Sequence, residues 1–76
     1  MMTFGQRIKT LREDREPPLS QARLAETLGS SQRKISHLER DEAEPNLEDL
    51  RRLCLYYHVS ADYLLGLPSD LPYPKP

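Results

Sequence analysis

Hydrophobic residues recur at steps of three and four along most of the chain, which is the spacing of one face of an α-helix. The first such stripe consists of Phe4, Ile8 and Leu11. Thr3 and Gln6 stand before it in the pattern of a capping box, so a helix is expected to begin there. We expect this helix to end near Arg15, because the prolines at 17–18 disfavour helical backbone in the residues before them.

Two further short helices are predicted, separated by a very tight joint. Ser20 is placed to cap the first of them, whose hydrophobic stripe consists of Leu24, Ala25 and Leu28. Gly29 is placed to end this helix, and Ser31 is placed to cap the next, which we expect over residues 32–40. Two helices joined this tightly, with a glycine at the joint, are the pattern of a helix-turn-helix.

The rest of the pattern predicts two more helices and a tail. Pro45 stops helical backbone and Asn46 caps a fourth helix, whose expected stripe consists of Leu47, Leu50, Leu53, Cys54 and Tyr57. A short fifth helix is expected over residues 61–65. The fold class is therefore all-α, with five helices in one domain over residues 1–67 and the helix-turn-helix at the second and third of them. Residues 68–76 form a Pro-rich tail, expected to be extended or disordered.

Charge is distributed unevenly along the chain. The net charge of −1 argues against a general binder of polyanions. Residues 6–40, however, hold eight Lys or Arg and five Asp or Glu, a net charge of +3. Residues 41–76 hold three Lys or Arg and seven Asp or Glu, a net charge of −4. The N-terminal half can therefore face an anion while the C-terminal half faces away from it.

The remaining composition favours a cytoplasmic protein without catalytic chemistry. The single cysteine, Cys54, falls on a predicted buried stripe, so we expect a core residue and no intrachain disulfide. No hydrophobic run approaches the ~20 residues of a membrane span, and the N-terminus lacks the hydrophobic region of a signal peptide. No arrangement of residues indicates a metal site, a cofactor site or a catalytic site, so an enzyme is not expected.

The third predicted helix carries the most informative surface. At ~100° per residue, Ile35 and Leu38 fall together and point into the core, with Lys34 and Glu39 at the borders. The opposite arc carries Gln32, Arg33, Ser36, His37 and Arg40. These amide, guanidinium, hydroxyl and imidazole groups, with no carboxylate among them, suit the edges of DNA bases. An ordinary solvated helix face is the alternative, and the preceding short helix and tight joint favour the first interpretation.

Four segments also match the pattern of a known family. They are "RIKTLRED" (7–14), "LSQARLAETLG" (19–29), "SSQRKISHLERDEAEP" (30–45) and "LRRLCLYYHVSADYLLGL" (50–67). On these segments the chain resembles the phage repressor/Cro-like, or XRE-type, helix-turn-helix family. The resemblance implies a lambda-repressor-like bundle whose third helix inserts into the major groove of double-stranded DNA. It also implies a sequence-specific transcriptional regulator, a repressor that binds a palindromic operator as a homodimer.

The resemblance assigns roles to individual residues. The predicted base contacts are Gln32, Arg33, Ser36 and His37. The predicted phosphate contacts are Gln21, Ser31, Lys34 and Arg40, of which Lys34 is included because it lies within reach of the backbone. Arg12 of the first helix is expected to pair with Glu39 of the third, so both are structural.

The segment after the third helix departs from the family pattern. Asp41 stands where the family usually has glycine, and Glu42 and Glu44 make the loop acidic. Repulsion from phosphate is expected to weaken DNA binding at this loop. The alternative function is therefore a protein-interaction module that has kept the fold with little DNA binding.

The fourth helix and the tail offer a candidate dimer surface. Its hydrophobic residues are Leu55, Tyr56, Leu67 and Leu71. The alternative is ordinary exposure of single hydrophobic residues, or a tail that folds back over them. No ligand-binding domain is evident in the 76 residues, so a control signal is expected to come from a protein partner or from proteolysis.

Overall fold

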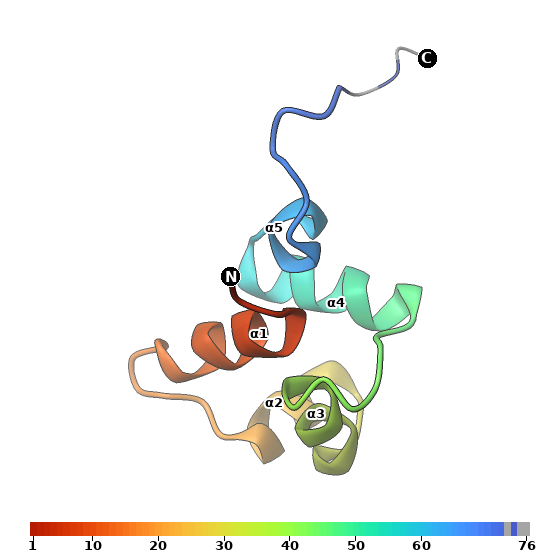
Figure 1. Ribbon diagram of the computed structural model, residues 1–76. Coiled ribbons are helices and arrows are strands. Elements are labelled where there is room, and N and C mark those ends of the chain that lie inside the picture. The colour runs from red at the N-terminus through yellow and green to blue at the C-terminus, as the bar shows by residue number, and fades with distance from the viewer. Residues whose placement is uncertain (73, 75–76) are drawn as a thin grey trace.

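Five helices follow one another in the part of the chain that the structure, a computed structural model, describes, namely residues 1–72 and 74. They are α1 (Phe4–Glu13), α2 (Gln21–Leu28), α3 (Gln32–Glu39), α4 (Leu47–Tyr57) and α5 (Ala61–Leu65). No strand occurs among these residues. Helices α2 and α3 lie at one end of the bundle, and α5 and the tail lie at the other (Figure 1). The predicted all-α fold with a helix-turn-helix at α2 and α3 is confirmed.

Every helix begins at a side chain that accepts a hydrogen bond from the backbone N–H three residues on. These caps are Thr3, Ser20, Ser31, Asn46 and Ser60, with bonds of 2.7–3.1 Å. Gly29 and Gly66 end α2 and α5 with φ of 67° and 72°, a backbone conformation that costs glycine little. Local chemistry therefore sets the helix boundaries.

Two groups of buried side chains form the core. Ile8, Leu38, Leu53 and Leu64 make up one group, and Leu24, Ala25 and Ile35 make up the other. Leu28 and Tyr57 are partly buried and pack against both groups, so the helix-turn-helix and the rest of the bundle share one continuous interior.

The start of α1 lies directly against the end of α3. Gly5 is buried there, and a Cβ atom at this position would overlap the carbonyl oxygens of Leu38 and Glu39. Asp41, whose φ is 58°, accepts hydrogen bonds from the Thr3 hydroxyl at 2.5 Å and from the Gly5 N–H at 3.0 Å. The close approach of α1 to α3 therefore requires glycine at position 5. The hydrogen bonds to Asp41 hold the start of α1 in this position.

Three details differ from the sequence-based expectations. Helix α1 ends at Glu13 with Asp14 as its cap, and α3 ends at Glu39 with Arg40 as its cap. The placement of Leu47 on the buried stripe is wrong, since 78% of its surface is exposed. Leu47 is the first residue of α4, and the first hydrophobic residue of that helix that packs against the core is Leu50.

The chain after α5 contains no helix or strand through residue 72 and runs away from the bundle (Figure 1). Residues 73, 75 and 76 of the predicted tail lie outside the described residues. Within the described ranges, no helix is long and hydrophobic enough to cross a membrane.

Tyr57 provides a test of this packing. Its hydroxyl is buried without a hydrogen-bond partner among the described residues, and burial raises its pKa from 10.0 to about 12. We expect Tyr57→Phe to be neutral or up to ~1 kcal/mol more stable at pH 7, because it removes an unsatisfied polar group.

The same substitution should change how stability depends on pH. The raised pKa means that the folded protein holds the phenol proton more tightly than the unfolded chain does. The stability of the wild type that depends on this proton is therefore fully present below pH 10 and is lost as pH rises toward 12. Urea unfolding at pH 7, 10 and 11 should show the advantage of Tyr57→Phe over wild type growing through this window. Parallel pH profiles for the two proteins would contradict the assignment.

Candidate nucleic-acid interface

A buried ion pair joins α1 to α3. The Arg12 guanidinium donates from Nε to Glu39 Oε2 at 2.6 Å and from Nη2 to Glu39 Oε1 at 2.9 Å. Its Nη1 donates to the Leu19 carbonyl at 2.8 Å, and Glu39 is only 6% exposed. The hydrogen bonds to Glu39 raise the pKa of Arg12 above its usual value. Arg12 thus stays charged, and the Glu39 carboxylate is compensated where water is excluded.

The same carboxylate also holds the first residue of α2. Gln21 Nε2 donates to Glu39 Oε1 at 3.0 Å. Glu39 therefore ties α1, α2 and α3 together at one point. A side-chain amide has two N–H groups, so Gln21 keeps one donor for an external anion.

The exposed start of α3 carries unengaged polar side chains. Gln32 and Arg33 are exposed and Ser36 is half-buried. None of the three side chains forms a hydrogen bond or ion pair with another described residue. Because the backbone beneath them is held by the Ser31 cap and by Ile35 in the core, these groups sit on a rigid support.

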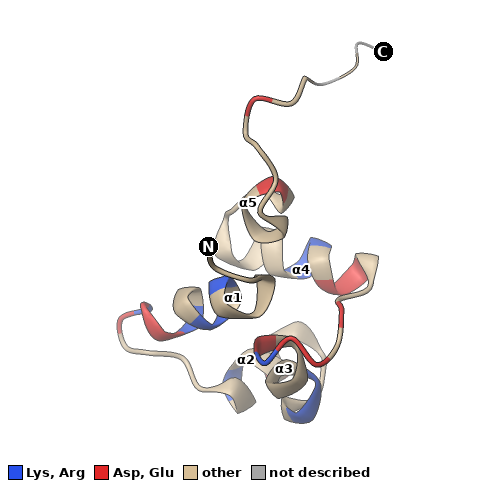
Figure 2. Cartoon of the chain, in the orientation of Figure 1, with Lys and Arg blue, Asp and Glu red and all other residues tan. Residues whose placement is uncertain are grey.

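Three further side chains of this face, those of Lys34, His37 and Arg40, lie beside carboxylates. Lys34 Nζ lies 2.8 Å from Asp49 Oδ2 of α4. Arg40 Nη2 lies 3.1 Å from Glu42 Oε1, and His37 Nε2 lies 4.0 Å from the same oxygen. The acidic segment after α3 runs beside that helix (Figure 2).

These pairs were not foreseen from the sequence. The helical wheel of α3 contains no carboxylate on the outer arc, but Glu42 and Asp49 approach that arc from the following loop and from α4. Glu42 belongs to the acidic segment 41–44, which the sequence does show, whereas nothing in the sequence pattern marked Asp49 as the partner of Lys34.

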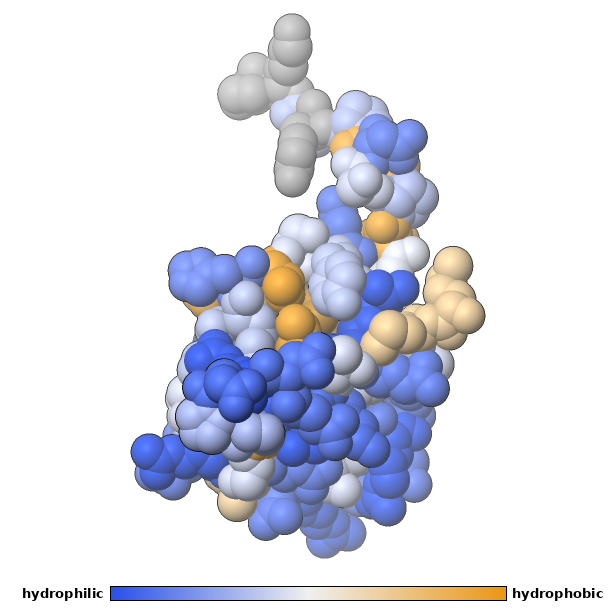
Figure 3. All heavy atoms as spheres, turned by 90° about the vertical axis from the view of Figure 1, so that its left-hand side faces the viewer, coloured by the Kyte–Doolittle hydropathy of each residue, from blue (hydrophilic) through white to orange (hydrophobic). Residues whose placement is uncertain are grey.

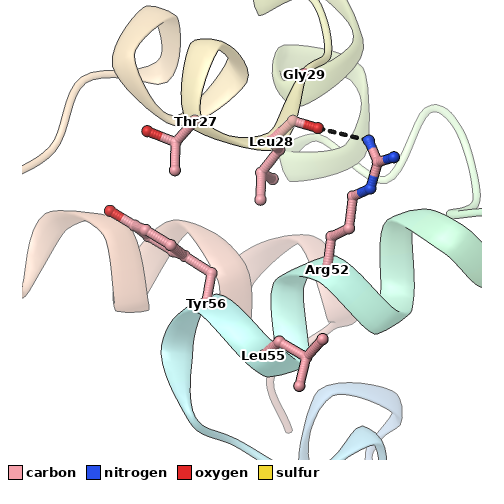
Figure 4. Close-up of a pocket in the computed structure, with 6 residues that line it drawn as sticks. All are labelled: Thr27, Leu28, Gly29, Arg52, Leu55 and Tyr56. Carbon is pink, nitrogen blue, oxygen red and sulfur yellow. Dashed lines mark hydrogen bonds between the residues drawn. The ribbon is translucent and has the colours of Figure 1, made fainter.

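Arg52 fixes the other end of α2. Its Nη1 donates to the Leu28 carbonyl at 2.7 Å (Figure 4), and its Nε donates to Glu48 Oε1 at 2.9 Å. A cation at the end of a helix compensates carbonyl groups that have no partner within the helix. Helix α2 is therefore tied to α3 at its start and to α4 at its end.

The predicted dimer residues do not gather in one hollow. Leu55, 69% exposed, and Tyr56 line one beside α2 (Figure 4). Leu67 lines a second hollow with Arg7, and Leu71 is exposed on the tail. In Figure 3, the helix-turn-helix end is almost wholly hydrophilic and the hydrophobic surface lies nearer the tail.

Comparison with known proteins places this geometry in context. A family model described as "Helix-turn-helix domain" matches residues 3–65. The HTH-type transcriptional regulator ImmR of Bacillus subtilis (strain 168) is 37% identical over 65 residues, which are 86% of this chain and 50% of that protein. The uncharacterized HTH-type transcriptional regulator YobD of the same strain is 37% identical over 72 residues, which are 95% of this chain and 62% of that protein. The chain thus spans only about half to three fifths of these relatives.

Two solved structures are also similar. One is the P22 c2 repressor in complex with synthetic operator 9T, with a TM-score of 0.77, 38% identity and coverage of 86% of this chain and 96% of that chain. The other is the DNA-binding domain of the P22 c2 repressor in solution, with a TM-score of 0.72, 38% identity and coverage of 83% and 80%.

The buried ion pair predicts a large loss of stability on truncation. Glu39→Ala leaves the Arg12 guanidinium without its partner, so we expect unfolding to become easier by ~3–5 kcal/mol. The matched control is Glu26→Ala, which removes an exposed carboxylate of α2 and should change stability by less than ~0.5 kcal/mol. Chemical denaturation followed by circular dichroism measures both. Equal curves for the two variants would show that the pair has no stabilising role.

Proposed function

We propose that the chain, which belongs to the helix-turn-helix family, is a sequence-specific DNA-binding transcriptional regulator that represses by occupying an operator. The observation that carries the proposal is the exposed, unengaged start of α3 on a support fixed by Glu39. The operator-bound P22 c2 repressor, similar along 86% of this chain, supports it.

In the proposed complex α3 enters the major groove with its N-terminus first. Gln32 would bond the edge of adenine, and Arg33 would grip guanine with two hydrogen bonds. Ser36 and His37 lie one turn further along α3 and would contact the neighbouring base pairs. These four side chains give the complex its sequence preference.

The proposed phosphate contacts surround this helix. Gln21 and Ser31 lie at the starts of α2 and α3, where backbone N–H groups favour an anion. Lys34 and Arg40 would reach phosphates after exchanging their carboxylate partners. Such contacts position the protein on the duplex without reading its sequence.

We further propose that the regulator acts as a homodimer on a palindromic operator. Leu55 of α4 is 69% exposed, and Leu47 of the same helix is 78% exposed. A two-fold contact through this side of α4 would bury Leu55 and Leu47. Of the further predicted members, Tyr56 shares a hollow with Leu55, whereas Leu67 and Leu71 lie elsewhere on the surface. A separate protein partner that controls activity would act on the assembled dimer.

The alternative is a protein-interaction module that keeps the fold with little DNA binding. The carboxylates beside Lys34 and Arg40 favour it, because they neutralise cations that would otherwise attract phosphate.

Selection from random duplexes at low salt separates the two functions. The regulator should enrich a motif made of two inverted half-sites whose centres lie about 10–10.5 base pairs, or a multiple of that, apart. A single enriched half-site would remove the homodimer from the proposal. The absence of any enriched sequence would favour the interaction module.

Arg33 offers a test at the level of one base pair. Arg33→Ala should lose ~1–3 kcal/mol of discrimination at particular positions of the selected motif. Arg33→Lys is the matched variant, because it keeps the charge but not the planar fork, and it should lose discrimination with little change in salt dependence.

Lys34→Ala should instead weaken all duplexes similarly and flatten the salt dependence. Titrations on the motif and on single-base variants measure these effects, and a uniform loss for Arg33→Ala would reject its role.

A further inference from the structure

We propose that Glu42 is an internal competitor of DNA phosphate, held by the fold against the Arg40 guanidinium at the end of α3. The inference rests on the proposed function, since it concerns how tightly that surface binds DNA. Its starting point is the position of one oxygen atom. Glu42 Oε1 lies 3.1 Å from Arg40 Nη2 and 4.0 Å from His37 Nε2.

The backbone of Glu42 is fixed by the way α3 ends. The Glu42 N–H donates to the His37 carbonyl at 2.9 Å, and the Asp41 N–H donates to the Leu38 carbonyl at 3.2 Å. This pair of bonds, with Asp41 at a φ of 58°, is a Schellman motif. The motif places the residue after Asp41 beside the last turn of the helix, where His37 and Arg40 project.

A second anchor holds the same turn from the other side. The Asp41 carboxylate accepts hydrogen bonds from the Thr3 hydroxyl and the Gly5 N–H at the start of α1. The turn is therefore bound both to its own helix and to a neighbouring one. A carboxylate whose backbone is held in this way loses less freedom on pairing than one at the tip of a mobile loop.

The Arg40–Glu42 ion pair is exposed, and this exposure limits how strongly Glu42 can oppose phosphate binding. The side chains of Arg40 and Glu42 are 59% and 52% exposed. Exposed ion pairs are weak, so a phosphate can displace Glu42 from Arg40. The displaced carboxylate then lies within a Debye length of that phosphate and repels it. Glu42 thus reduces affinity without closing the surface.

The effect is expected to be independent of sequence. Arg40 is a proposed phosphate contact, so whatever opposes it weakens specific and non-specific duplexes alike. Neutralising Glu42 should also free one more cation to replace a counterion of the duplex, which steepens the dependence of affinity on salt.

Glu42 is a better test position than Asp49, which pairs with Lys34 in the same manner. The Asp49 carboxylate also accepts from the Asn46 N–H at 3.3 Å in the capping box of α4, so its replacement would disturb that helix. The side chain of Glu42 has no such structural duty, because its backbone makes the bonds that end α3.

The experiment compares Glu42→Gln with Glu44→Gln in the full chain. The two variants remove the same charge from the same loop, but Glu44 pairs with no cation among the described residues. Affinity is measured for the duplex selected by the wild type and for an unrelated duplex, over a series of salt concentrations. Unfolding curves verify that both variants fold as the wild type does.

We expect Glu42→Gln to bind both duplexes about three- to tenfold more tightly at low salt, with the log–log salt slope steeper by about one. Glu44→Gln should gain less and keep the salt slope of the wild type, because its carboxylate repels phosphate only at long range and pairs with no described cation that its removal would free. In an Arg40→Ala background the gain from Glu42→Gln should fall to the level of Glu44→Gln.

Each contrary outcome has a distinct meaning. Equal gains for the two variants would overturn the inference, because net loop charge would then explain the effect. DNA binding by wild type and Glu42→Gln with the same affinity would overturn the inference and leave the proposed function standing. If neither protein binds any duplex, the proposed function fails and the inference fails with it.

Discussion

The buried carboxylate of Glu39 is the constraint on which the arrangement of the first three helices depends. It belongs to α3, and it accepts hydrogen bonds from Arg12 of α1 and from Gln21 of α2. A buried carboxylate without partners is costly, so the three helices must meet at one place for the fold to be stable. The orientation of α3 is thereby set from inside, and its outer face is free to carry polar groups that bind something else.

Directional polar contacts set the orientation of α3, because the hydrophobic core cannot set it alone. Burial of Ile35 and Leu38 holds α3 to the bundle, but hydrophobic attraction is not directional. The angle between elements is set at the helix ends, where Asp41 binds the start of α1 and Arg52 binds the end of α2. The helix-turn-helix is therefore held to the rest of the bundle by polar contacts at its helix ends.

The pattern of the sequence predicted what depends on neighbouring residues, whereas the one contact between distant residues that was expected, the Arg12–Glu39 pair, came from the family resemblance. Helix number, order and caps followed from spacing and from residues such as Ser31, because capping is local. The need for glycine at position 5 could not be predicted, since it arises only where α1 meets the carbonyl groups of α3. Leu47 was misplaced because a helical wheel does not show where the opposing surface ends. The outer face of α3 was identified, but the carboxylates that approach it from elsewhere were not.

Those carboxylates bear on the phosphate contacts of the proposed interface and not on its base contacts. Phosphate contacts supply most of the affinity for DNA of any sequence, and base contacts supply the preference among sequences. In the proposed complex the carboxylate partners of Lys34 and Arg40 would weaken the first kind of contact, whereas Gln32 and Arg33, whose side chains pair with no other described residue, would be available for the second. Lower affinity for every duplex reduces the protein held on unrelated DNA while the ratio between sequences is kept. In the proposed dimer a single half-site would bind weakly, so stable occupancy would require two half-sites bound together, and dimerisation would then control the operator.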